Sequence, residues 1–154
     1  MQNTIRIETL QKHQWKKFLC LQSLLIDGKI SLKASHLKQL GNIYFREIRV
    51  HHPPHYVWVA HLKGKYVGHL WGCILPIQLT QDKRKLNLFN IVVEPLFRRC
   101  GIGSALYIHA EKFCREREIG VIDCQTKLSD GDATHFCCKN GYRVDGLMFR
   151  RNLP

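Results

Sequence analysis

The chain has 154 residues, 45% of them hydrophobic and 23% charged, an ordinary composition for a globular protein with one sizeable core. No apolar run approaches the roughly 18 residues that a membrane span needs, and the N-terminus lacks the basic-then-apolar order of a secretory signal, so we expect a cytoplasmic location. The net charge of +12 favours binding of small anions, nucleic acid or an acidic surface, or it simply reflects a basic, solvated protein surface. The basic residues are spread along the chain, which weakens the case for a dedicated nucleic-acid-binding arm.

The first third of the sequence predicts one strand and two helices. Residues 4–8 alternate apolar and polar side chains, as a half-buried strand does. Helical spacing of apolar residues then predicts a helix that begins after Thr9 and stops at Asp27-Gly28. A second helix is predicted from Ser35 to about Val50, because the two prolines in the segment 51–55 end it. We interpret the three histidines of that segment as part of a solvated loop rather than as metal ligands.

A hairpin and a strand–turn–helix unit are predicted in the middle of the chain. Residues 56–62 and 65–75 are rich in aromatic and β-branched side chains and flank Lys63-Gly64, a turn signal. The next segments are expected to be a polar turn at 81–85, a strand at 86–93 and a helix at 104–118. The inward face of that helix should carry Leu106, Ala110 and Phe113.

The last part of the chain is predicted to contribute a strand, a short helix and two final strands. They lie at 121–126, about 132–139, 142–144 and 147–150. The complete order, β-α-α-β-β-β-α-β-α-β-β, predicts an α/β (α+β) fold with a central mixed sheet and helices packed on it. Because no repeat or low-complexity linker interrupts this order, residues 1–154 are expected to form a single domain.

The cysteines do not indicate a metal or redox motif. The sequence contains seven, at positions 20, 73, 100, 114, 124, 137 and 138, and none forms a C-x-x-C pair. We therefore expect free thiols in a reducing compartment and no metal site.

The stretch from Phe89 to Leu106 carries the clearest chemical signal. An apolar strand, Ile91 to Val93, is followed by Pro95 and then by Arg98-Arg99-Cys100-Gly101-Ile102-Gly103, which runs into a helix. The first amide N–H groups of a helix lack intrahelical acceptors and attract anions, and arginine guanidinium groups match phosphate oxygens. The local pattern therefore predicts a phosphate-binding turn, although it contains neither GxxxxGK[ST] nor GxGxxG.

The spacing Arg98-x-x-Gly101-x-Gly103 resembles the acetyl-coenzyme A signature Q/R-x-x-G-x-G/A of the GCN5-related N-acetyltransferases. The resemblance implies a mostly antiparallel, twisted sheet of about six to seven strands flanked by about four helices. It also implies acetyl-coenzyme A as co-substrate, with the backbone of the strand contacting the pantetheine arm and thioester and the turn contacting the pyrophosphate. The residues implied in this way are Ile91, Val92, Val93, Arg98, Arg99, Cys100, Gly101, Ile102, Gly103 and Ser104.

A second segment, Asp130-x-x-Ala133-x-x-Phe136-Cys137-x-x-x-Gly141-Tyr142, resembles the family motif N-x-x-A-x-x-F-Y-x-x-x-G-F. In the family the tyrosine of this motif protonates the departing thiolate of coenzyme A, and here Cys137 takes its place. A thiol has a reference pKa of about 8.5, against about 10 for tyrosine, so Cys137 is a candidate acid. The other interpretation, held equally, is that Cys137 is a small buried hydrophobe and water supplies the proton.

The general base has no clear candidate in the sequence. Where many family members carry a carboxylate on the strand before the turn, this chain has Asn90, which cannot take a proton at neutral pH but can position a water. Asn87 is a second candidate for positioning a water, and His69 has a suitable intrinsic pKa for a base. The carboxylates of Asp123 and Glu8 are less clearly placed, so we assign no base.

The sequence thus predicts an acyltransferase: an acetyl-coenzyme A-dependent N-acetyltransferase in which an amine attacks the thioester directly. The alternative is a catalytically impaired module of the same fold that binds coenzyme A or nucleic acid, motivated by Cys137 and the missing carboxylate. The expected partners are acetyl-coenzyme A and an amine acceptor, either a small molecule, including an antibiotic, or a protein amino group. Nucleic acid is not favoured, no membrane is expected, and the protein should be a monomer or homodimer. Because twelve acidic residues face twenty-four basic ones, we do not expect a strongly acidic pocket for polyamines.

Overall fold

The computed structural model describes residues 4–25, 34–49, 54–78, 83–126, 129–146, 148–149 and 151. The chain divides into a large unit, Met1–Asp123, and a small unit, Cys124–Pro154. The predicted helix end at Asp27-Gly28, the residues 50–53 and the first two residues of the predicted turn at 81–85 lie outside the described residues, whereas residues 84 and 85 of that turn belong to a strand. Within the described ranges, no helix has both the length and the apolar character needed to cross a membrane.

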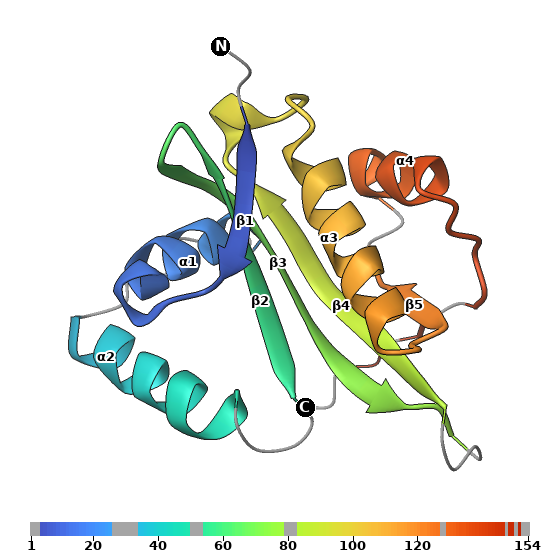
Figure 1. Cartoon of the computed structure of the whole chain (residues 1–154), viewed down its shortest axis with the longest axis horizontal. Coiled ribbons are helices and arrows are strands. Elements are labelled where there is room, and N and C mark those ends of the chain that lie inside the picture. The colour runs from blue at the N-terminus through green and yellow to red at the C-terminus, as the bar shows by residue number, and fades with distance from the viewer. Residues whose placement is uncertain are drawn as a thin grey trace. The chain divides into compact units, whose positions relative to one another are not determined.

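A five-stranded sheet with the order β1-β2-β3-β4-β5 forms the centre of the fold (Figure 1). Its strands are β1 (Ile5–Thr9), β2 (His55–Leu62), β3 (Lys65–Pro76), β4 (Arg84–Val93) and β5 (Val121–Cys124). The pairs β1–β2, β2–β3 and β3–β4 are antiparallel. The predicted hairpin is confirmed. Lys63 and Gly64 have φ values of 51° and 76°, the left-handed conformations that both central residues of a type I′ hairpin turn require.

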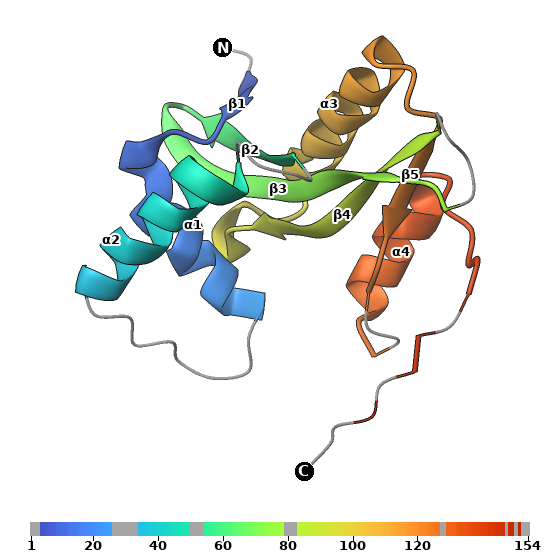
Figure 2. The same ribbon diagram turned by 90° about the horizontal axis from the view of Figure 1, so that it is seen from below.

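Helices cover both faces of this sheet within the large unit. They are α1 (Trp15–Gln22), α2 (Ala34–Ile43), which continues as a π-helical turn over Tyr44–Ile48, and α3 (Ile102–Glu116). Figure 2 shows α1 and α2 on one face and α3 on the other. Leu106, Ala110 and Phe113 of α3 are buried, as predicted from their spacing.

The face under α1 and α2 has an aromatic core. Phe18 and Tyr44 are buried there with Val57 and Val59, and the ring of Trp71 packs against Phe18 with 5.8 Å between centroids. On the other side, β3 approaches β4 and the start of α3 so closely that only a glycine fits at position 68. A Cβ there would lie 2.7 Å from the carbonyl oxygen of Val92 and 3.3 Å from the side chain of Ile102.

The small unit contains α4 (Gly131–Lys139), which confirms the predicted short helix. The two predicted final strands, at 142–144 and 147–150, are wrong where the structure describes them, since residues 142–146, 148 and 149 form neither strand nor helix. Val144, Met148 and Phe149 are 84%, 62% and 90% exposed, so the alternating pattern has no buried face to stabilise a strand. The mixed α and β fold with flanking helices is therefore confirmed, with five strands in the described chain.

Candidate functional site

The turn between β4 and α3 has the backbone geometry of an anion site. After Val93 the chain makes a short 3-10 turn, Pro95–Phe97, and Arg99 and Gly101 then adopt left-handed conformations with φ of 63° and 79°. The helix begins at Ile102, and its first backbone bond runs from the amide of Ala105 to the carbonyl of Gly101 at 3.0 Å. The amides that precede Ala105 in this turn therefore have no intrahelical acceptor and can bind phosphate oxygens.

Two arginines flank these amides. Arg98 donates its Nε to the carbonyl oxygen of Val93 at 3.2 Å, which ties the guanidinium group to the end of β4. Its terminal nitrogens are not part of this bond, and Arg99 and Cys100 are exposed beside it. The structure thus brings Arg98, Arg99 and Cys100 together in one exposed loop before the start of α3, with positive charge that suits phosphate oxygens.

Several predicted cofactor residues can contribute only their main chain. The side chains of Val92 and Ile102 are 3% and 1% exposed, so they belong to the core. Gly103 and Ser104, half-buried in the first turn of α3, offer their amides at the same helix end. Contacts of residues 92 and 102–104 with a ligand therefore depend on the geometry of their backbone. The identity of their side chains does not predict such contacts.

A bulge in β4 lies next to the predicted catalytic Asn90. Trp71 of β3 pairs with Asn90, whereas the next residue, Gly72, pairs with Leu88, so Phe89 is an extra residue in the strand. The ring of Phe89 packs edge-on against Trp71 with centroids 5.2 Å apart, and it stacks on His55 at 5.5 Å. Asn90 is half-buried and hydrogen-bonds the side chain of Gln22 on α1. Asn87, the second candidate, pairs with Cys73 before the bulge.

The environment of His69 excludes it as a general base near neutral pH. Its ring is fully buried, with Nε2 2.9 Å from the side-chain nitrogen of Gln22 and Nδ1 2.8 Å from the hydroxyl of Tyr66. Burial lowers the pKa of His69 to about 3, because a charged ring would lose its hydration. Neither Gln22 nor Tyr66 carried a sequence signal for this role, since Gln22 and His69 are 47 residues apart.

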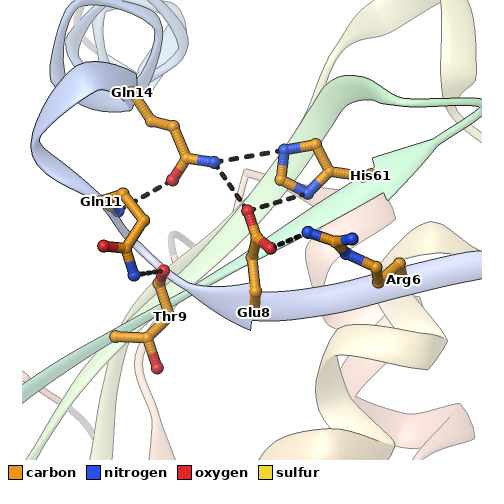
Figure 3. Close-up of polar contacts among 6 residues, drawn as sticks. All are labelled: Arg6, Glu8, Thr9, Gln11, Gln14 and His61. Atoms are coloured by element: carbon orange, nitrogen blue, oxygen red, sulfur yellow. Dashed lines mark hydrogen bonds and ion pairs between the residues drawn. The ribbon is translucent and has the colours of Figure 1, made fainter.

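The other two carboxylates considered above are held in ion pairs. Glu8 on β1 binds Arg6, Gln14 and His61 (Figure 3), and the hydrogen bonds from Arg6 and Gln14 lower the pKa of its carboxyl group. Asp123 accepts a hydrogen bond from Lys85 at 2.6 Å. Neither carboxylate contacts Asn90 or its partner Gln22 in the described contacts.

The second motif forms α4 with its two caps. Asp130 accepts a hydrogen bond from the amide of Ala133 at 3.0 Å, so it caps the helix as an asparagine would, and Gly141 has the left-handed φ of 81°. Cys137 is half-buried, and burial raises the pKa of its thiol. It forms a side-chain hydrogen bond with Cys124. The thiol is therefore protonated at neutral pH, which a proton donor must be.

Comparisons with known proteins identify the family and the fold. A model of the acetyltransferase (GNAT) family matches residues 13–142. A comparison with curated proteins gives no significant match. Among solved structures, glucosamine-6-phosphate N-acetyltransferase from Arabidopsis thaliana is 18% identical and covers 98% of this chain and 99% of its own, with a TM-score of 0.78.

Two further solved structures share the fold as well. An aminoglycoside acetyltransferase from an uncultured soil metagenomic sample, in complex with sisomicin, is 22% identical over 99% of this chain and 98% of its own, with a TM-score of 0.77. AAC(6')-Iy in complex with a coenzyme A bisubstrate analogue is 16% identical over 98% and 99%, with a TM-score of 0.73. Identities this low support the fold and not a shared acceptor. Since the family model spans most of the sequence, the chain belongs to the GNAT family of acetyltransferases.

Proposed function

We propose that this protein is an acetyl-coenzyme A-dependent N-acetyltransferase. The observation that carries the proposal is the β4–α3 turn, where left-handed Arg99 and Gly101 present the amides at the start of α3 beside the anchored Arg98. Residues 1–154 would act as one catalytic domain in the cytoplasm. The +12 charge supports binding of an anionic co-substrate.

In the proposed complex the turn binds the pyrophosphate of acetyl-coenzyme A. The amides of residues 101–104 and the guanidinium groups of Arg98 and Arg99 supply the donors, while the exposed Cys100 lies between them. The backbone of Ile91, Val92 and Val93 is proposed to contact the pantetheine arm and the thioester carbonyl. Donors aimed at that oxygen stabilise the negative charge that develops on it during attack.

The proposed reaction forms one bond and breaks one bond. The nitrogen of the acceptor amine attacks the thioester carbonyl carbon, the C–S bond breaks, and the coenzyme A thiolate takes up a proton. The amine loses its proton to a water molecule. Asn90 can position this water, but it cannot itself accept the proton of the amine. We propose Cys137, a protonated thiol, as the group that supplies the proton to the thiolate.

A second candidate function is a module that binds coenzyme A without catalysis. It is favoured by the amide at position 90 and the thiol at position 137, where the family motifs have a carboxylate and a tyrosine. The proposed acceptor is a small-molecule amine or a protein amino group. Enzymes of this fold acetylate aminoglycosides and glucosamine-6-phosphate according to their names, so aminoglycosides and amino-sugar phosphates both belong in an acceptor panel.

Titration calorimetry with acetyl-coenzyme A tests the proposal. The native protein should bind, and Arg98→Ala should weaken binding by about tenfold to a hundredfold, since a charge-assisted hydrogen bond is worth about 1.5–3 kcal/mol. Arg115→Ala removes an equally exposed arginine from α3 that pairs with Glu111, and it should leave the affinity unchanged. Failure of the native protein to bind would refute the proposal. Binding without thiol release across the acceptor panel would favour the non-catalytic module.

A further inference from the structure

Two glutamine–histidine hydrogen-bond pairs join the two ends of α1 to the sheet. Gln14 precedes the helix and contacts Nε2 of His61 at 3.3 Å, and Gln22 ends the helix and contacts Nε2 of His69 at 2.9 Å. In both pairs the histidine follows its glutamine by 47 residues. Figure 3 shows the first pair, which also holds Glu8. The second pair lies at the bulge of β4, next to the proposed thioester site.

Gln22 makes a paired contact that Gln14 does not. Its Nε2 donates to Oδ1 of Asn90 at 2.9 Å, and its Oε1 accepts from Nδ2 of Asn90 at 3.2 Å. Two antiparallel hydrogen bonds fix the plane of the Asn90 amide as well as its position. A primary amide has two donor hydrogens and two acceptor lone pairs, so, among the residues that the structure describes, Asn90 keeps one hydrogen and one lone pair for another molecule.

The buried ring of His69 supports this orientation. Because Nε2 faces the side-chain nitrogen of Gln22, it acts as an acceptor, and the proton of the neutral ring is on Nδ1, which faces Tyr66. A protonated ring would place an N–H against the Gln22 amide nitrogen. Burial keeps the ring neutral, and the Phe18 ring packs on it with centroids 4.6 Å apart.

The bulge at Phe89 connects the hydrogen bonds among Gln22, His69 and Asn90 to the backbone segment proposed to contact the thioester. With Phe89 as the extra residue, the side chains of Phe89 and Asn90 both contact groups on the α1 side of the sheet, Trp71 and Gln22 respectively. The residues that follow, Ile91 to Val93, pair with β3 and are the proposed backbone contacts of the thioester. Asn90 is thus the side chain that immediately precedes this segment.

We propose that Gln22 is a positioning residue for acyl transfer. It holds the Asn90 amide so that the remaining hydrogen and lone pair of Asn90 orient the acceptor amine, or the water that takes its proton, beside the thioester. This inference rests on the proposed acetyltransferase function. It assigns a role to a helix residue that the family motifs do not include.

The test compares Gln22→Met with Gln14→Met. Both changes remove buried hydrogen bonds between α1 and the sheet at nearly constant side-chain volume, so both should lower the melting temperature. Only Gln22→Met should reduce kcat, by about tenfold or more, because misplacing a reacting group by about 1 Å can cost about a hundredfold in rate. The affinity for acetyl-coenzyme A should change less than twofold in either variant. Equal kcat values in both variants would overturn the inference.

A double mutant separates positioning from a general loss of structure. If Gln22 acts through Asn90, the variant Gln22→Met/Asn90→Ala should have the same kcat as Asn90→Ala alone. Multiplicative effects of the two changes would show that Gln22 acts independently of Asn90 and would overturn the inference.

A measurement without an acceptor distinguishes failure of this inference from failure of the proposed function. The side-chain amide signals of Asn90 should shift in NMR spectra when the native protein binds acetyl-coenzyme A, and more than with coenzyme A alone. In Gln22→Met the acetyl-dependent part of the shift should disappear while binding persists. Binding that leaves the Asn90 signals unmoved would overturn the positioning role alone, whereas no binding at all would overturn both proposals.

Discussion

Gln22, the last residue of α1, and Asn90, at the bulge of β4, form a reciprocal amide pair with hydrogen bonds of 2.9 and 3.2 Å across 68 residues of sequence. The pair joins the helix that covers one face of the sheet to the strand that leads into the β4–α3 turn. It also places an amide at the position where the family resemblance implied a carboxylate, and this has consequences for the pH dependence of the proposed catalysis.

The rate should depend on the ionisation of the acceptor rather than on that of an enzyme base. Asn90 cannot take a proton, and His69 stays neutral and buried near pH 7. We therefore expect kcat/KM to rise with pH along the titration of the acceptor amine. Two acceptors whose amine pKa values differ by about two units should give inflections about two units apart. A rise in kcat/KM with its inflection at the same pH for both acceptors would instead reveal a base on the enzyme.

His69 should make the protein less stable in mild acid. The pKa of His69 is about 3 in the folded state, against about 6.5 for an exposed histidine, so the unfolded state binds the proton more tightly. The contribution of neutral His69 is fully present above about pH 6.5 and is lost progressively as the pH falls towards 3. At pH 5 the loss should be about 2 kcal/mol relative to pH 7.

The measurement is urea unfolding of the native protein and of His69→Gln at both pH values. Glutamine keeps a polar group at the site without titrating, so the difference between pH 7 and pH 5 should shrink in the variant. The contributions of the other groups are common to both proteins and cancel in the comparison. An identical pH dependence of the two proteins would contradict the assignment of the effect to His69.

Gly68→Ala should damage both stability and cofactor binding. The new Cβ would lie 2.7 Å from the carbonyl oxygen of Val92, so β3 and β4 must move apart where the thioester is proposed to bind. We expect a loss of about 2 kcal/mol in the free energy of unfolding, typical of overpacking, and weaker binding of acetyl-coenzyme A. Gly120→Ala is the control, because its Cβ would meet nothing within 4 Å. Chemical denaturation and calorimetry measure the two effects.

Cys137→Ala tests the proposed proton donor. If the protonated thiol supplies a proton to the departing thiolate, kcat should fall by about tenfold to a hundredfold, at or below the lower end of what general acid catalysis contributes. Cys138→Ala, a change at the exposed neighbouring thiol, should leave kcat unaltered. Equal turnover by the native protein and Cys137→Ala would identify water as the donor.

The sequence by itself determined the features that depend on neighbouring residues. The left-handed Lys63-Gly64 turn, the glycine at position 101 before α3 and the caps of α4 at Asp130 and Gly141 are local geometries, set by backbone sterics and short-range hydrogen bonds. The inward face of α3 followed from helical periodicity in the same way. These features were enough to predict the order of elements up to α4, and the two sequence motifs were enough to predict the family.

Only the tertiary structure decided which distant groups meet and which lie out of water. The pairing of Gln22 with Asn90 depends on where α1 docks, and the bulge at Phe89 depends on the register of β4 against β3. His69 looked like a base because its intrinsic pKa suits that role, whereas burial under α1 lowers its pKa. The predicted final strands failed for a related reason: alternation along a chain shows that a strand is possible, but a strand forms only where packing buries one of its faces. Desolvation and register are properties of the folded core, and no single segment encodes them.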